Sequence, residues 1–187
     1  MEIMDAIYQR RATRDFADAP VDKTLISTLV AAAVQAPNAM DRQRWAFVVV
    51  QDRALLKRIS DAAKAHMLAT MKADSVVAEL RAHLSTASFN IFYNAPIAIV
   101  ICATESDTFA YQDCCLAAEN LMLAAHANGL GSCWIGFAET WLNEPAGKLA
   151  LGIPSHYRPI APIIVGVPRV TPPPPPRHQP DIIWIEP

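Results

Sequence analysis

Three arginines gather near the start of the chain, in the segment Gln9-Arg-Arg-Ala-Thr-Arg-Asp-Phe16. The whole chain has only 16 basic residues, so Arg10, Arg11 and Arg14 are a local concentration of positive charge. Arginine presents a planar fork of donors that matches the geometry of phosphate and carboxylate groups. The cluster therefore indicates either a site for an anionic ligand or a solvated charged turn. Taken alone, the segment favours the turn.

Other catalytic patterns are missing from the sequence. The five histidines are scattered, with no metal-ligand spacing and no HExxH motif, so we expect each to be structural or exposed. The four cysteines form no CxxC motif and lie among apolar residues, which favours buried free thiols in a reducing cytoplasm. There is no GxSxG nucleophile elbow. We therefore expect no metal and no catalytic protein residue, which suits an enzyme whose bound cofactor carries the chemistry.

Composition bounds the class of protein. The chain has 187 residues, of which 52% are hydrophobic and 18% charged, and this favours one domain over residues 1–187. A net charge of −2 argues against a nucleic-acid partner. No apolar run is long enough for a membrane span, and the acidic N-terminus is unlike a signal peptide, so we expect a cytoplasmic protein.

The hydrophobic pattern predicts helices and buried strands in one core. Helical spacing marks residues 3–8, a helix capped by Asp22, much of 53–92, about 111–128, and 141–151. Strand character marks residues 45–51, 97–102, a strand starting at 131, and 160–167. The glycines from Gly129 to Gly136 follow a helix instead of preceding one, which argues against a dinucleotide-binding loop. From about residue 168 we expect an extended arm, with a proline run and an apolar end that needs a partner.

Five segments together resemble the nitroreductase family of FMN-dependent oxidoreductases. They keep the family's order and run from the first helix to the tail. The second matches the family pattern Pro-Ser-x-x-Asn-x-Gln-Pro-Trp. The five segments are Arg10-Arg-Ala-Thr-Arg14, Pro37-Asn-Ala-Met-Asp-Arg-Gln-Arg-Trp45, Gly129-Leu-Gly-Ser-Cys-Trp-Ile-Gly136, Gly152-Ile-Pro154 with Pro162-Ile-Ile-Val-Gly-Val-Pro168, and the late basic residue Arg177.

The resemblance implies an α+β fold, a three-layer sandwich with a mixed central sheet between helices. It also implies an intertwined homodimer with two FMN sites at the interface, each built from both chains, and helix 111–128 as the dimer core. The arginine segment and Arg177 would hold the phosphate and ribityl end of FMN. The segment from Pro37 to Trp45 would come from the partner chain, and the segment from Gly129 to Gly136 would pass beside the flavin ring. The residues so implied are Arg10, Arg11, Ala12, Arg14 and Arg177; Pro37, Asn38, Ala39, Asp41 and Gln43; and Ser132, Cys133, Trp134, Ile135 and Gly136.

The chain departs from the family pattern at a few positions. Ala12 stands where serine or threonine is usual, and Asn38 replaces serine. Asp41 replaces asparagine, which places a negative charge near the polar edge of the ring. Arg44 replaces proline, and we expect it to offset Asp41.

The activity implied by the resemblance is ping-pong hydride transfer, with NADH or NADPH as reductant and nitroaromatics, quinones or similar planar molecules as acceptors. Phe89, Phe92 or Phe109 could line the acceptor slot, although core packing is favoured for each. Two alternatives remain open. One is a flavin enzyme with a narrow substrate, such as a dehydrogenase or a dehalogenase. The other is a flavin-binding storage or regulatory protein without turnover.

Overall fold

Four antiparallel strands form the sheet of the computed structural model, which describes residues 1–71 and 75–186. The strands are β1 (Trp45–Val50), β2 (Ile97–Ala103), β3 (Gly131–Trp134) and β4 (Arg158–Gly166), in the order β1-β2-β4-β3. The register pairs Val48 with Val100, Val100 with Pro162, and Cys133 with Ile164. All of β2 is buried, as the continuous β-branched and apolar sequence predicts.

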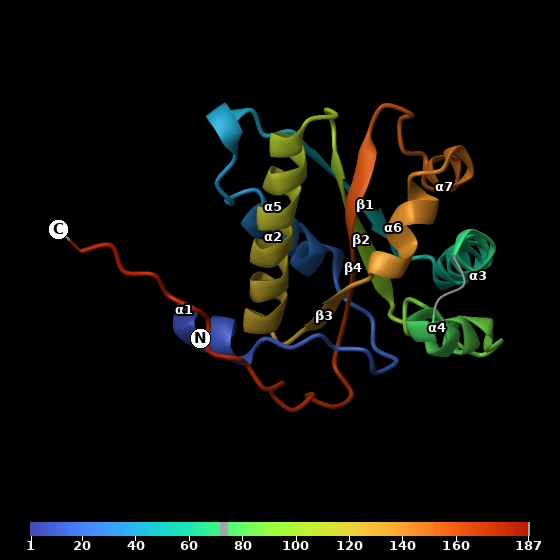
Figure 1. Ribbon diagram of the computed structural model, residues 1–187, viewed down its shortest axis with the longest axis horizontal. Helices are drawn as coiled ribbons and strands as arrows, with labels where there is room; N and C mark the ends of the chain where they lie inside the picture. The colour runs from blue at the N-terminus through green and yellow to red at the C-terminus, as the bar shows by residue number, and fades with distance from the viewer. Residues whose placement is uncertain (72–74, 187) are drawn as a thin grey trace.

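Helices cover both faces of this sheet, so the predicted three-layer sandwich is confirmed (Figure 1). On one face lie α2 (Lys23–Ala33) and α5 (Thr108–Ala127), with α1 (Ile3–Gln9) against α5. On the other lie α3 (Arg53–Thr70), α4 (Ser75–Ser85), α6 (Gly136–Leu142) and α7 (Pro145–Leu151). The expected mixed sheet needs one correction, because the strands themselves pair only antiparallel within the described residues. Parallel pairing is confined to a bridge between Ala12 and Ser132.

The helix α5 is the central element of the sandwich. Its first turn is capped by Asp107, whose side chain accepts a hydrogen bond from the Ala110 N–H at 2.8 Å. It ends at Asn128 and Gly129, where a φ of +75° at Gly129 allows the left-handed cap that the sequence predicts. Small, fully buried side chains, such as Ala117 and Ala118, let the helix lie close to α2 and the sheet.

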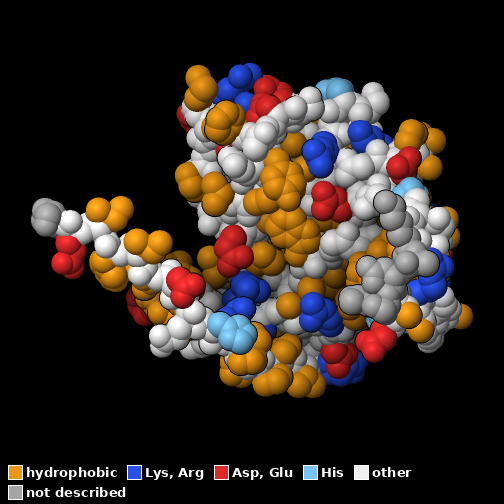
Figure 2. Space-filling view, viewed as in Figure 1, with side chains coloured by type: hydrophobic (Ala, Val, Ile, Leu, Met, Phe, Trp, Pro, Cys, Tyr) orange, Lys and Arg blue, Asp and Glu red, His pale blue; other side chains and the backbone are white. Residues whose placement is uncertain are grey.

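The structure differs from the sequence prediction at one helix and at the C-terminal tail. The single helix expected over 141–151 is two helices, because Pro145 lacks an N–H and starts a new helix after Glu144. The tail forms no strand in its described part, although strand character was expected over 181–185. Its apolar end is open to solvent, with Ile183 88% and Ile185 95% exposed. Figures 1 and 2 show this tail leaving the body beside α1 with its hydrophobic side chains uncovered.

Gly147 marks the tightest packing between α6 and α7 and supplies a test of the fold. A Cβ at this position would meet the Trp141 carbonyl oxygen and would lie 2.7 Å from the Leu142 Cα. Because both contacts are with backbone, we expect Gly147→Ala to lower the free energy of unfolding by about 1–3 kcal/mol. Gly136→Ala is the control, since a Cβ there meets nothing within 4 Å. Urea denaturation of both variants measures the difference, and equal stabilities would contradict this packing.

Candidate functional site

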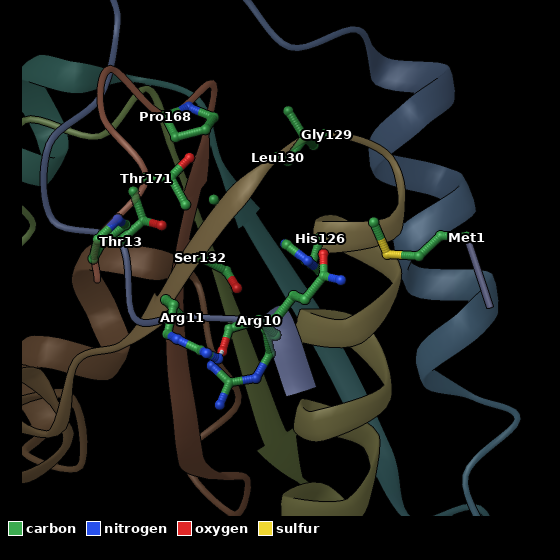
Figure 3. A pocket seen from close by; sticks show the side chains of 13 residues that line it. Met1, Arg10, Arg11, Thr13, His126, Gly129, Leu130, Ser132, Pro168 and Thr171 are labelled. Atoms are coloured by element: carbon green, nitrogen blue, oxygen red, sulfur yellow. Dashed lines mark hydrogen bonds between the residues drawn. The ribbon is translucent and has the colours of Figure 1, made fainter. Parts of the chain in front are cut away.

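The arginine segment lines a cavity of about 220 Å³ at the C-terminal end of α5 (Figure 3). Arg10 and Arg11 come from the segment after α1, His126 from the last turn of α5, and Ser132 from β3. Thr171, at the start of the tail, completes the wall. The N–H of Thr13 donates to the Ser132 carbonyl at 2.9 Å, and this bond fixes the arginine segment along β3. The predicted meeting of the first and third motifs is therefore present.

Three buried polar atoms at this cavity have no hydrogen-bond partner within residues 1–71 and 75–186. They are Arg10 Nε, His126 Nε2 and Ser132 Oγ. Arg10 Nε lies 3.4 Å from Glu119 Oε1, but without hydrogen-bond geometry. A buried polar group left unpaired costs about 1–3 kcal/mol. Three such atoms around one cavity are what a site for a ligand with several oxygen atoms requires.

The electrostatic character of the cavity is positive. Burial, followed by the charges of Arg10 and Arg11, lowers the pKa of His126 below its ordinary value. The imidazole is therefore pushed toward its neutral form by its burial and by the positive charges around it. An anion would relieve this repulsion. The cavity therefore suits a phosphate or carboxylate, and the residues present fit the phosphate of a cofactor such as FMN.

The arginines of the segment make different contacts. The Arg11 guanidinium donates to the Tyr8 and Arg10 carbonyls, at 2.6 and 2.7 Å, and so also caps the end of α1. The Arg14 guanidinium lies over the Tyr93 ring, 5.8 Å from its centroid. Arg14 and Tyr93 line a second cavity of about 160 Å³, together with the predicted site residues Trp134, Ile135 and Gly136.

Two other predicted residues lie between the cavities. Ala12 is half-buried at its bridge with Ser132 and supplies no side-chain hydrogen bond. Cys133 points into the core on the α6 side of the sheet, and burial raises the pKa of its thiol. The role of Cys133 in the cofactor site stays a prediction. All four cysteines are free, as the sequence predicts.

The second motif lies at the opposite end of α5. The Ala39 N–H donates to Asp113 Oδ1 at 3.0 Å, and the Gln43 N–H donates to Asn38 Oδ1 at 2.9 Å. Met40, Asp41 and Gln43 have φ values of 57°, 51° and 51°, in the left-handed region that non-glycine residues rarely adopt. Pro37 is exposed beside this loop. Such strain persists only where the surroundings hold it, and it is common at functional sites.

Arg44 holds the loop, and its predicted role was wrong. Its guanidinium is buried and donates to Asp107 Oδ2 at 2.7 Å, with Asp113 Oδ2 at 3.5 Å. It does not offset Asp41. That carboxylate accepts instead from Gln43 Nε2 at 3.0 Å. Arg44 thus ties the strained loop to the first turns of α5.

The loop and the arginine segment cannot share one small cavity within a single chain. Asp113 contacts the loop, and His126 lines the arginine cavity. At 1.5 Å per residue, the 13 steps between them span about 20 Å of helix. The structure therefore brings the first and third motifs together and leaves the second motif apart.

The sequence predicted the positions of some residues relative to the cavities less accurately. Arg177 is exposed on the tail and is not among the residues that line either cavity, so its role stays a prediction. His126 was expected to be structural or exposed, yet it lines the cavity. The only signal for it was its position three residues before Gly129. Of the suggested slot residues, Phe92 is core and Phe109 is 60% exposed.

The fold and site define an α+β sandwich with a phosphate-sized, cation-lined cavity beside its sheet. Among the described residues, no cluster of three potential ligands could hold a metal ion, and no helix is long and apolar enough to cross a membrane. Residues 7–167 match the model of the nitroreductase family, and the chain belongs to this family of oxidoreductases.

Similar proteins agree with this assignment. A protein of Methanothermobacter thermautotrophicus, named provisionally as an NADH dehydrogenase/NAD(P)H nitroreductase, is 30% identical over 190 residues, covering 100% of this chain and 87% of that protein. A nitroreductase from Bacteroides fragilis with bound FMN superposes with a TM-score of 0.86 at 24% identity, over 100% of both chains. A nitroreductase from Desulfitobacterium hafniense with bound FMN has a TM-score of 0.82 at 27% identity, again over 100% of both chains.

The Arg44 network gives a direct test of how the loop is held. Arg44→Met leaves Asp113 buried and without its cation, so we expect a loss of about 3 kcal/mol in the free energy of unfolding. Adding Asp113→Asn removes the stranded charge and keeps an acceptor for the Ala39 N–H, so the double variant should recover more than half of that loss. Arg53→Ala is the control, because its ion pair with Asp18 is exposed and should contribute less than about 1 kcal/mol. A double variant no more stable than Arg44→Met would contradict the network.

Proposed function

We propose that this protein is an FMN-dependent oxidoreductase that uses NADH or NADPH to reduce nitroaromatics, quinones or similar planar acceptors in a ping-pong cycle. Three findings support the proposal: membership of the nitroreductase family, likeness to a nitroreductase structure that holds FMN, and the cation-lined cavity. The cavity with its three unpaired polar atoms is the observation that carries it.

The residues around the two cavities divide the work of holding the cofactor. Arg10 Nε and Ser132 Oγ are free to donate to phosphate oxygens, and Arg11 adds positive charge. Arg14, with Trp134, Ile135 and Gly136, would line the place of the ring end. When bound, FMN supplies the two-electron chemistry, and the protein supplies orientation and electrostatics.

We further propose that the working protein is a homodimer in which Pro37 to Gln43 reach the partner's arginine cavity. About 20 Å of α5 separates these parts within one chain. Apolar side chains on α1 and α5 are uncovered, with Ile3 64% and Leu116 45% exposed. The apolar tail end is uncovered as well. A second copy would cover these surfaces and complete each site with the loop of the other chain.

Within this arrangement no protein group needs to act as an acid or base. The rigid loop would hold Asn38 and Gln43 at the polar edge of the ring, and Asp41 would add a negative charge moderated by its bond from Gln43. The arginines would hold the cofactor between turnovers, while nicotinamide and acceptor take turns over the open ring face. The acceptor would be selected by shape, since planar rings stack on a planar surface.

The activity is tested on the purified protein. We expect the purified protein to be yellow, or to turn yellow when FMN is added, and to show the absorption spectrum of a protein-bound flavin. Anaerobic addition of NADH or NADPH should bleach it, and a nitroaromatic or quinone should restore the colour. A protein that cannot be reconstituted with FMN would overturn the proposal. If neither nicotinamide bleaches a yellow protein, the storage or narrow-substrate alternative replaces the reductase.

The arginine cavity is tested by FMN affinity. Arg10→Ala should weaken FMN binding by about 1.5–3 kcal/mol, the value of a hydrogen bond to a charged group, and Arg14→Ala should also weaken it because Arg14 lines the second cavity, at the ring end. Arg58→Ala is a matched control, because Arg58 is an exposed arginine on α3 that lines neither cavity. Fluorescence titration of the apoprotein measures all three. Wild-type affinity in both site variants would remove the arginine segment from the cofactor site.

A further inference from the structure

We propose that His126 is a ligand of the FMN phosphate and takes up a proton when the phosphate binds, so that FMN affinity falls as pH rises. This inference rests on the proposed function and adds to it a binding residue and a form of regulation. It starts from the geometry of the cavity at the end of α5.

His126 lines the cavity in which the phosphate would sit. It lies in the last turn of α5 and lines the same cavity as Arg10, Arg11 and Ser132 (Figure 3). Its Nε2 is buried and, among the described residues, has no hydrogen-bond partner. Arg10 Nε and Ser132 Oγ are unpaired in the same way. Ser132 is 2% exposed, so water is poorly placed to satisfy its hydroxyl. One phosphate has enough acceptor oxygens for all three groups.

The charges that face His126 set its protonation before and after binding. Arg10 and Arg11 lie on the segment after α1, Met1 lines the cavity, and Glu119 on α5 lies beside Arg10. Burial and the two arginines lower the pKa of the free imidazole. A phosphate with a charge of −1.5 to −2 would reverse the local field and favour imidazolium.

The sign of the effect follows from proton linkage. Binding raises the affinity of His126 for a proton, so one proton moves from solvent to the imidazole between the free and the bound pKa values. An event that takes up a proton weakens as pH rises through that window. Below about pH 6 the phosphate itself becomes protonated, which gives an opposite trend. The fall of FMN affinity with rising pH is therefore expected above pH 6. Comparison with a variant that lacks the imidazole cancels the contributions of other groups.

The experiment titrates the full-length apoprotein with FMN at pH 6.5 and 8.5, using flavin fluorescence. Riboflavin is the probe that lacks the phosphate. We expect wild-type FMN affinity to fall about two- to threefold between these pH values, because a one-unit rise in pKa allows at most about tenfold over its whole window and the pKa of the free imidazole already lies below its ordinary value. His126→Gln keeps an N–H donor but cannot ionise. It should bind FMN about tenfold more weakly at pH 6.5, lose most of the pH dependence, and bind riboflavin as the wild type does. His156→Gln, at an exposed histidine outside the cavity, is the control and should change nothing.

Two results would overturn the inference. In one, His126→Gln leaves FMN affinity and its pH dependence unchanged. In the other, the variant weakens FMN and riboflavin equally, which marks a structural role. NMR of the wild-type protein gives a measurement that needs no variant. FMN should raise the pKa of the His126 imidazole, and riboflavin should leave it unchanged. Binding of FMN without this response overturns the role of His126 alone. A wild-type chain that binds neither flavin overturns the proposed function as well.

Discussion

The length of α5 is the constraint on which the rest of the structure depends. Twenty residues from Thr108 to Ala127 make a rod of about 30 Å. The helix packs on the sheet through small, fully buried side chains, so its two ends are rigidly placed. Each end carries one half of the predicted site. In the proposed homodimer, a second chain running the other way would bring the loop of one chain to the arginine segment of the other.

The two ends of α5 differ in how their polar groups are satisfied. At the N-terminal end Asp113 accepts from Ala39, and buried Arg44 holds Asp107 and Asp113. That network gives a strained loop a fixed shape before any ligand arrives. Among the described residues, Arg44 Nε and Asp113 Oδ2 at this end lack a hydrogen-bond partner, as do polar atoms of Arg10, His126 and Ser132 at the C-terminal end. The hydrogen bonds of Arg44 and Asp113 thus give the loop its shape, and the donors that line the cavity are available for an anion.

The sequence predicts the layers and most elements of this fold, because periodicity and capping are local properties. The capped start of α2 and the glycine end of α5 are examples, since Asp22 accepts from Thr24 and Gly129 adopts a positive φ. The break before Pro145 was missed although it is local, because apolar residues continue through it. The antiparallel order of the strands depends on contacts far apart in sequence and could not be derived from periodicity.

The site was predictable in its motifs and less so in its contacts. Arginine spacing identified a cluster, but which arginine faces which cavity depends on the bridge between Ala12 and Ser132. The partner of Arg44 was misplaced, because Asp41 is near in sequence while Asp107 and Asp113 are near in space. His126 gave no motif at all, since its role depends on where α5 ends. The position of the Arg177 side chain depends on a tail that has few contacts with its own chain.

The central claim is that each site combines the arginine segment of one chain with the loop of another. Subunit complementation tests it most directly. One chain carries Arg10→Ala with Arg14→Ala, the other carries Asn38→Ala with Gln43→Ala, and each is confirmed to bind FMN poorly alone. The account predicts that the purified hybrid dimer binds one FMN with wild-type affinity, because one site then receives both intact halves. A hybrid that binds no FMN tightly would show that both halves must lie in the same chain and would contradict the account.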